Sequence, residues 1–453
     1  MTERWRICTE MTRQGTLFRV QRPAKFPKRK GRAISGPKTD NMIMIGARIE
    51  RISPLISLST TMESFPSFPH ELLGAIVTHV RSPSDLLQLR ATNSTLNTFA
   101  TPLVFRSVTL ANRDNRIRSF KLLANSRLAP HVREVVFQYM EVDPDRESEP
   151  VPDYAPRGYD GTAFVEALGH ITHFPALESL VLNFRENDGP FKSDTGGDAH
   201  EREFPGEVIL QFLIFKALSE QPIRFLPPLK SLIVDKYLPL PNPAIKTRSI
   251  IALLGKLSHL AIKTTSPCAA FPMTDPRFES YFSESLFQKE VVPTSLVSLE
   301  LHHACVRPAD MVIPISDLHF PHLQILSLQR NYFGDQSEFN DLEGFIARHG
   351  RTLLELKIFL CPMAMSTSMT PKARPKHFRR WSQLWERLNG DLKVLRNLVV
   401  SERHDSKGVE DDDVARYVDN CHHLNAMKLE ESEDVKDSEA LNRFQKIVES
   451  RVQ

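Results

Sequence analysis

Residues 323–331 read LQILSLQRN, a short run in which hydrophobic residues recur at fixed spacing before an asparagine. Residues 353–361, LLELKIFLC, repeat this spacing and end in a cysteine. Side chains alternate along a strand, so the last two hydrophobic residues of each run point to the same face. Asn331 and Cys361 then stand where a buried polar side chain can satisfy backbone groups of a turn. The two runs therefore predict a repeated strand-and-turn unit.

The hydrophobic spacing L-x-x-L-x-L recurs ten times along the chain. The ten units begin at Phe105, Val132, Leu177, Leu229, Leu257, Leu296, Leu323, Leu353, Leu395 and Leu424. Their start-to-start spacings are 27, 45, 52, 28, 39, 27, 30, 42 and 29 residues, and five of these nine lie between 27 and 30. That period, and the Asn or Cys that ends two units, are typical of leucine-rich repeats. Most units lack the Asn or Cys, so we expect a degenerate array with irregular curvature.

Helical patterns separate most of these units. They cover residues 207–220, 279–290, 338–349 and 377–389, and a last pattern at 437–450 predicts a capping helix over the end of the array. Strands that alternate with helices favour parallel strands joined by crossovers. At the repeat spacing each strand can pair with the next. The expected fold is therefore α/β, an irregular solenoid with parallel strands on the concave face and helices outside.

Strand alternation also predicts which side chains face outward along the concave sheet. Early units carry outward aliphatic residues, and later units carry polar or charged ones. Such a surface suits a protein segment, although single aliphatic side chains on a sheet can also have no function. The candidate substrate-binding residues are Val136, Val181, Ile233, Lys263, Glu300, His302, Gln329, Glu355 and Lys357.

Residues 63–105 have a different pattern, three short apolar helices. The run FPHELLGAIVTHV at 68–80 has helical spacing and one broad apolar face. Pro83 is expected to break the chain, with Ser84 or Asp85 capping a second helix, and a third apolar set follows. A core this small is marginal alone, so we expect the segment to pack on a neighbour or a partner.

This segment resembles an F-box, as found in fungal F-box/leucine-rich-repeat proteins. Phe68-Pro69 stands where the family has Leu-Pro. Residues 71–73, Glu-Leu-Leu, match the acidic residue and leucines that follow in the family, and residues 85–87 match its second helix. The run ATPLVFRSVTL at 100–110 is similar to the junction between an F-box and the first repeat. Gly74 is a departure from the family pattern, because glycine is a poor helix former and should lower the stability of the first helix by about 1 kcal/mol relative to Ala.

The resemblance implies that the F-box docks on a Skp-type adaptor, which links it to a cullin in an SCF-type ubiquitin ligase. The repeats would bind a substrate protein, and the chain itself would perform no covalent chemistry. The residues that the resemblance assigns to the adaptor contact are Phe68, Pro69, Glu71, Leu72, Leu73, Ile76, Leu86 and Leu89. The alternatives are a helical cap without a partner, a repeat scaffold that serves no ligase, and nucleic-acid binding through a basic leader.

Charge is distributed unevenly along the 453 residues, which hold 58 Lys and Arg and 55 Asp and Glu. Residues 1–40 hold 11 basic and 3 acidic residues, so the rest holds 47 basic and 52 acidic residues, a net charge of −5. The body is therefore not a polyanion binder by composition. We expect a disordered basic leader at 1–62, the F-box at 63–105 and the repeats at 106–453, with Met62 as an alternative start to Met1.

Other classes of protein are disfavoured by missing motifs. The five cysteines are odd in number and form no CxxC pair, which fits a reducing compartment and hence cytoplasm, nucleus or both. No apolar run is long enough to span a membrane, and neither GxGxxG nor GxxxxGKS/T occurs. His170 with His173, and His319 with His322, have HxxH spacing without further ligands. We therefore expect no metal, cofactor or catalytic residue.

Overall fold

The computed structural model describes most of the repeat region, and all described residues lie in the compact unit Ser59–Gln453. They are residues 69–111, 114–138, 162–184, 206–237, 242–264, 293–303, 315, 318–334, 341–365, 380–401, 417–419 and 431–452. The expected leader, the helical pattern at 279–290 and the repeat unit at Leu424 lie outside them.

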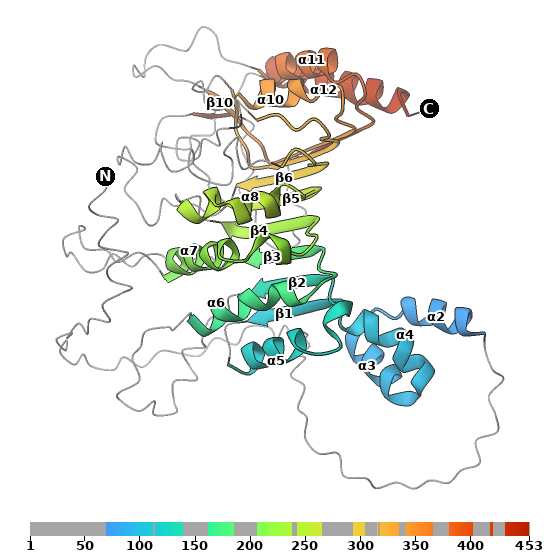
Figure 1. Cartoon of the computed structure of the whole chain (residues 1–453). Helices are drawn as coiled ribbons and strands as arrows, with labels where there is room; N and C mark the ends of the chain where they lie inside the picture. The colour runs from blue at the N-terminus through green and yellow to red at the C-terminus, as the bar shows by residue number, and fades with distance from the viewer. Residues whose placement is uncertain are drawn as a thin grey trace, which may run out of the picture. The chain divides into compact units, whose positions relative to one another are not determined.

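The fold is mixed α/β, and a parallel sheet of nine strands dominates the described part of the chain (Figure 1). The strands are β1 Ser107–Ala111, β2 Glu134–Gln138, β3 Ser179–Asn183, β4 Ser231–Tyr237, β5 His259–Thr264, β6 Ser298–His303, β7 Ile325–Gln329, β9 Glu355–Phe359 and β11 Asn397–Ser401. They lie side by side in chain order, and every neighbouring pair is parallel. Each strand begins two residues after the start of a sequence unit, so nine of the ten units form the strands they predict.

The strands share a common register, which aligns the same position of each unit. Leu180 of β3 lies opposite Leu232 of β4, and Leu299 of β6 lies opposite Leu326 of β7. All four leucines are at most 2% exposed. Burying one Leu side chain contributes about 1.5–3 kcal/mol, so these aligned rows supply a core that runs across the sheet.

Helices follow most of the strands. Their bounds are α5 Asp114–Ala124, α6 Thr162–Leu168, α7 Gly206–Ser219, α8 Arg248–Leu254, α10 Leu342–Arg348, α11 Trp381–Asp391 and α12 Glu431–Ser450. Short 3-10 helices are η1 Ala129–His131, η3 Gly169–His173, η5 Ile223–Phe225 and η6 Pro243–Lys246. Figure 1 shows α5 to α8 stacked in the order of the strands, and each contacts the next. Buried and half-exposed residues alternate along β2, β3, β7 and β9, so one face of the sheet is covered and the other stays accessible.

Three of the expected helical patterns form helices between strands. The pattern at 207–220 forms α7, and the pattern at 377–389 forms α11, which begins later, at Trp381. The helix α10 is shorter than the pattern at 338–349 because Asp341 caps its start, where the carboxylate accepts a backbone N–H at 2.7 Å.

The C-terminal end of the array is closed by α12, as the last helical pattern predicts. Trp381 and Trp385 of α11 stack with their ring centroids 5.0 Å apart, and Phe444 of α12 lies 6.4 Å from Trp385. Asp437 of α12 is buried and accepts the Ser382 N–H at 2.7 Å, which satisfies a donor in the first turn of α11. The two helices thus share an apolar contact and a cap.

A second, three-stranded parallel sheet was not anticipated from the sequence. It consists of β8 Phe333–Gly334, β10 Met363–Met365 and β12 Tyr417–Asp419, in the order β12-β10-β8. The strands β8 and β10 follow β7 and β9 after the turns that contain Asn331 and Cys361. Strands of two or three residues are too short for a hydrophobic period to reveal them.

A three-helix unit precedes the sheet in the chain. Its helices are α2 His70–Thr78, α3 Pro83–Thr92 and α4 Ser94–Val104. Val77, Leu86 and Ala100 form its own small core, separate from the core of the sheet.

The start of α3 differs from the sequence prediction. The expected break between the two helices lies at residues 79–82, and Pro83 is the first residue of α3, where its fixed φ suits helical geometry. The cap is Ser82, and neither Ser84 nor Asp85, since the Ser82 side chain accepts the Asp85 N–H at 3.4 Å.

Candidate functional site

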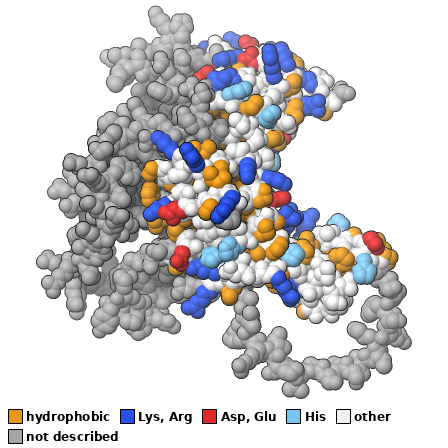
Figure 2. Space-filling model, in the orientation of Figure 1, with side chains coloured by type: hydrophobic (Ala, Val, Ile, Leu, Met, Phe, Trp, Pro, Cys, Tyr) orange, Lys and Arg blue, Asp and Glu red, His pale blue; other side chains and the backbone are white. Residues whose placement is uncertain are grey.

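The first candidate surface is the outer side of α2. Leu72 and Ile76 are one helical turn apart and so lie on the same side of the helix. They are 52% and 57% exposed, whereas Val77 on the core side is 1% exposed. Figure 2 shows hydrophobic side chains on the surface of the lobe that Figure 1 labels α2, α3 and α4. We call Leu72 and Ile76 the apolar edge, because the core of the three-helix unit does not use them.

The eight residues assigned to the adaptor contact differ in their exposure. Pro69, Glu71, Leu72 and Ile76 are exposed, and Leu73 and Leu89 are partly buried. Leu86 is only 5% exposed and belongs to the core of the three-helix unit, and its assignment to the adaptor contact stays a prediction. Phe68 lies outside the described residues. The resemblance assigned these residues from their sequence positions and could not tell which of them face the core.

Gly74 explains how closely α2 and α4 approach. A Cβ at this position would lie 3.3 Å from Cε1 of Phe99, a contact that few real side chains make. His70, one turn earlier, meets the same Phe99 ring edge-on, with 6.4 Å between centroids. The glycine that lowers helix propensity therefore lets Phe99 pack directly on α2.

Arg90 fixes α3 to α4. Its Nε donates to Oδ1 of Asn97 at 3.2 Å and to Oγ1 of Thr101 at 3.0 Å, and its guanidinium lies 4.9 Å from the ring centroid of Phe105. Asn93 ends α3, and its side chain caps α4 by accepting a backbone N–H at 2.8 Å. These contacts give the three-helix unit a defined geometry despite its small core.

The second candidate surface is the accessible face of the nine-stranded sheet. The nine residues that alternation assigned to this face all lie at half-exposed positions of their strands. Val136, Val181 and Ile233 are neighbours in register on β2, β3 and β4, and Ala261 follows on β5. Neighbouring strands lie about 4.8 Å apart, so these four side chains form one continuous apolar row.

The later strands carry polar side chains on the same face. Lys263 of β5 lies opposite His302 of β6, which lies opposite Gln329 of β7. On β9, the Lys357 Nζ lies 2.7 Å from the Glu355 Oε1. The face thus changes from aliphatic to charged along the array, and its use in substrate binding stays a prediction.

Two buried polar side chains follow β7 and β9 at equivalent positions. Asn331 Nδ2 donates to the Leu301 carbonyl at 2.9 Å and to the Gln329 carbonyl at 3.0 Å. Cys361 Sγ lies 3.5 Å from the Leu328 carbonyl and 3.3 Å from the carbonyl two residues before it. Burial raises the pKa of the Cys361 thiol to about 12, so the thiol stays protonated and can donate. The expected role of Asn331 and Cys361 at the turns is confirmed.

The backbone takes a left-handed conformation at the residue before each of these positions. Arg330 has a φ of 55° and Leu360 a φ of 51°, and Lys236, at the same place in an earlier unit, has a φ of 59°. This conformation costs a non-glycine residue roughly 1–2 kcal/mol. Backbone hydrogen bonds of 2.9 Å from the Arg330 and Leu360 N–H groups to the next strand hold the turn in place.

Thr264 and His303 form a buried polar pair at the ends of β5 and β6. Thr264 Oγ1 lies 2.8 Å from Nδ1 of His303, and the two residues are neighbours in register. Burial, together with the nearby charge of His302, lowers the pKa of His303 from 6.5 to about 3. His303 is therefore neutral at neutral pH, and its contact with Thr264 joins the ends of the two strands.

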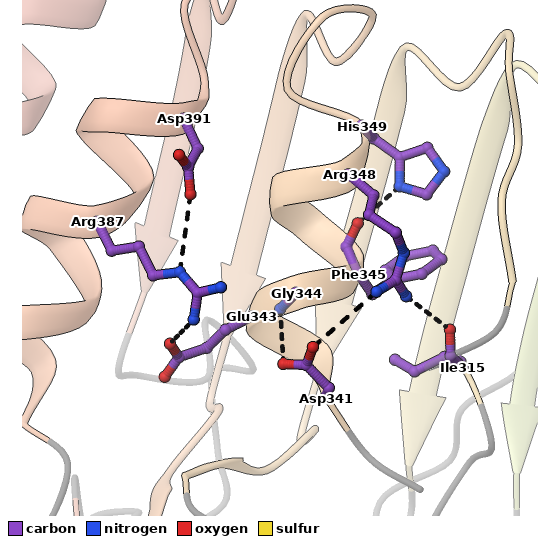
Figure 3. A network of polar contacts seen from close by, with 9 residues as sticks. All are labelled: Ile315, Asp341, Glu343, Gly344, Phe345, Arg348, His349, Arg387 and Asp391. Carbon is purple, nitrogen blue, oxygen red and sulfur yellow. Dashed lines mark hydrogen bonds and ion pairs between the residues drawn. The ribbon is translucent and has the colours of Figure 1, made fainter. Parts of the chain in front are cut away.

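A polar network surrounds α10 (Figure 3). His349 is buried, and its Nδ1 donates to the Phe345 carbonyl at 2.7 Å while its Nε2 accepts the Phe320 N–H at 2.9 Å. Both ring nitrogens are thus used by the neutral tautomer that carries its proton on Nδ1. Burial lowers the pKa of His349 to about 4, which keeps this arrangement neutral.

The same network ties α10 to α11 by charge. Glu343, which is buried, accepts from the Arg387 guanidinium at 3.0 Å, and Arg387 Nε lies 3.7 Å from the Asp391 carboxylate. On the other side, Arg348 donates to the Ile315 carbonyl at 3.2 Å. These contacts hold α10 against its neighbours, so the network supports packing.

Histidines from both HxxH pairs make aromatic contacts. The His170 and His173 rings meet edge-on at 5.0 Å between centroids, and His319 stacks on His349 at 5.2 Å. Within the described ranges, no group of three or more His, Cys, Asp or Glu residues could hold a metal ion. Among the helices that the structure describes, none has the length and apolar character to cross a bilayer.

Two comparisons with known proteins found no match. No protein-family model matches the chain, and no curated protein matches it. The two candidate surfaces, the apolar edge and the accessible sheet face, therefore carry the functional argument.

Proposed function

We propose that the chain is the substrate-recognition subunit of an SCF-type cullin–RING ubiquitin ligase. In this proposal residues 63–105 are an F-box that docks on a Skp-type adaptor. Residues 106–453 are a degenerate leucine-rich-repeat solenoid that binds a substrate protein. The observation that carries the proposal is the apolar edge of Leu72 and Ile76, which is exposed on a unit whose core, among its described residues, holds three buried side chains.

The exposure of the apolar edge supports a binding role for α2. Isolated exposed aliphatic residues are common, but Leu72 and Ile76 lie on one side of a nine-residue helix. Leu87 of α3 is a further exposed aliphatic residue of the same unit, at 38%. A partner that covered Leu72 and Ile76 would gain about 1.5–3 kcal/mol from these two side chains together, because each is already about half buried.

The accessible sheet face supports a substrate-binding role for the repeats. The apolar row on β2 to β5 and the polar residues on β6 to β9 lie on one face, and the common register keeps them in fixed rows. Such a face can hold an extended protein segment with aliphatic and charged residues.

In the proposed role the chain performs no covalent chemistry. It holds the substrate near a ubiquitin-conjugating enzyme that the cullin recruits, which raises the effective concentration of a substrate lysine at the reacting thioester. The buried, neutral His303 and His349 and the protonated Cys361 agree with such a role, because each is used in packing.

The test is capture of the adaptor and the cullin from cells by the tagged full chain. The double variant Leu72→Asp/Ile76→Asp should lose both proteins, because each carboxylate would have to be desolvated at the interface. The matched control is Leu122→Asp, since Leu122 of α5 is 72% exposed outside the three-helix unit. Equal capture of the adaptor by the folded double variant would refute the proposal. Capture of the adaptor without the cullin would favour the non-ligase scaffold.

A further inference from the structure

A row of cations lies where the first strands of the sheet begin. Arg106, Arg133 and Lys230 occupy the second position of the units that form β1, β2 and β4, and Glu178 occupies it in β3. Because the strands are parallel, their N-terminal ends meet at one edge of the sheet. The chain around α5 is also basic, since residues 106–133 hold seven Lys and Arg against one acidic residue.

Two further cations lie in loops at this edge. Arg127 is in the connection between α5 and β2, and Lys256 is in the connection between α8 and β5. All five cations are exposed. We call them the basic rim, which consists of Arg106, Arg127, Arg133, Lys230 and Lys256.

One carboxylate, that of Glu178, is shared among several of these cations. Its Oε1 lies 3.1 Å from the Lys230 Nζ and 3.6 Å from the Arg133 guanidinium. The pKa of Glu178 is lowered, first by the hydrogen bond from Lys230 and also by the charges of Lys230, Arg133 and Arg106. Glu134 at the start of β2 accepts a hydrogen bond from Ser107. The rim therefore keeps an excess of positive charge on a body whose net charge outside residues 1–40 is −5.

The rim lies next to the apolar row of the accessible face. Arg133 precedes Val136 by three residues and Lys230 precedes Ile233 by three residues, on strands that pair with β3 on either side. Three residues of strand span about 10 Å. Consider a bound peptide that runs along the strands with an aliphatic side chain on the apolar row. Its residues two to four positions away then lie at the rim.

We propose that the basic rim binds an acidic segment of the substrate protein, one in which Asp or Glu residues flank aliphatic residues. This inference rests on the proposed function for the identity of the partner as a substrate. It adds the chemical class of the recognised segment. Guanidinium groups pair with carboxylates through two parallel hydrogen bonds, so Arg106, Arg127 and Arg133 suit such a segment.

A nucleic acid is the other polyanion that a basic surface could bind. Glu178 lies between Arg133 and Lys230, where it would repel a phosphate and a carboxylate alike, so the neighbouring side chains must distinguish the two partners. The neighbouring row of Val136, Val181 and Ile233 is aliphatic and offers no ring on which bases could stack. This aliphatic row favours a protein segment.

The experiment measures binding of a fluorescein-labelled Glu-rich peptide with a central leucine pair to the full chain. Fluorescence anisotropy gives its affinity at low salt, and the same peptide with Gln in place of Glu is the charge control. We expect the double variant Arg127→Glu/Lys230→Glu to bind at least about tenfold more weakly. The matched control Lys436→Glu/Lys446→Glu, with two exposed lysines of α12, should bind as the parent does. Thermal unfolding verifies that both variants are folded.

Three outcomes would overturn the proposal. The first is equal affinity of the parent and the rim variant, and the second is equal affinity of the Glu and Gln peptides. The third is tighter binding of labelled oligo-dT than of the Glu peptide, lost in the rim variant, which would assign the rim to nucleic acid. Adaptor capture by the rim variant separates this proposal from the proposed function, because it depends on the apolar edge and not on the rim.

Discussion

Asn331 and Cys361 bind equivalent backbone carbonyls in successive strands of the sheet. Each side chain reaches the carbonyl two residues before it and a second carbonyl on the preceding strand, that of Leu301 for Asn331 and that of Leu328 for Cys361. The two chemically different side chains therefore have the same role. Each donates to buried carbonyl acceptors where β7 or β9 ends.

We predict that this position tolerates either side chain but not an apolar one. Asn331→Ala should lower the free energy of unfolding by about 2 kcal/mol, because it leaves two carbonyls without the amide. Cys361→Ala should cost less, since a thiol is a weaker donor, and Cys361→Asn should cost less again. Urea unfolding of the three variants measures the order. A larger loss for Cys361→Asn than for Cys361→Ala would contradict the equivalence.

The thiol of Cys361 should resist alkylation in the folded protein. It is buried and its pKa is raised to about 12, so almost no thiolate exists at neutral pH. Iodoacetamide followed by peptide mass spectrometry should find Cys361 modified in urea and unmodified in buffer. Rapid modification under native conditions would show that the turn after β9 opens.

Stability should fall as the solution is made acidic, and the two buried histidines should cause part of the fall. The folded-state pKa is about 4 for His349 and about 3 for His303, both below the ordinary value of 6.5. Below pH 6.5 the unfolded chain takes up protons that the folded chain does not, so the free energy of unfolding decreases down to these pKa values. Above pH 7 these groups add no pH dependence. Urea unfolding between pH 7 and pH 5 should show a smaller slope for His349→Gln than for the parent.

The three-helix unit should separate stability from binding between a core residue of α3 and two exposed residues of α2. Leu86→Ala should destabilise the unit by about 2–5 kcal/mol, because Leu86 is 5% exposed in its core. Leu72→Ala/Ile76→Ala should change stability by less than about 1 kcal/mol, since both side chains are exposed. Hydrogen exchange of α2 to α4 measures both effects. Strong destabilisation by the double variant would mean that the apolar edge belongs to the core.

The cap from α12 should stabilise the end of the array. Asp437→Ala should cost about 1 kcal/mol or more, because it removes the acceptor of the Ser382 N–H in a buried place. Asp437→Asn retains an acceptor oxygen and should lose less. Hydrogen exchange at the start of α11 reports the loss directly, and unchanged protection in Asp437→Ala would rule out the capping role.

Much of the sheet could be predicted because its information is local. Side chains in a strand alternate with a period of two, so the spacing of hydrophobic residues such as Leu177, Leu180 and Leu182 marks a strand wherever it occurs. The recurrence of the pattern then implies parallel pairing, since a crossover must return the chain to the same edge. The position of Asn331 and Cys361 follows from the same count of residues.

The exposed side of α2 could not be predicted in this way. Leu72, Leu73, Ile76 and Val77 all fit one broad helical face, and only the packing of α4 against Gly74 decides that Val77 is buried and Ile76 is not. Helical periodicity gives the width of an apolar face, whereas a neighbouring helix covers only part of it.

The sequence alone determined where strands begin, which of their side chains alternate inward, and which polar residues end two of them. Only the tertiary structure decided which apolar residues stay exposed. It also decided which distant residue caps a helix, as Asp437 does for α11, and where Arg133, Glu178 and Lys230 meet. The physical reason is the distance along the chain over which each feature is decided. Alternation is a property of neighbouring residues in the chain, but burial, capping and charge clustering depend on segments that folding brings together from far apart in the sequence.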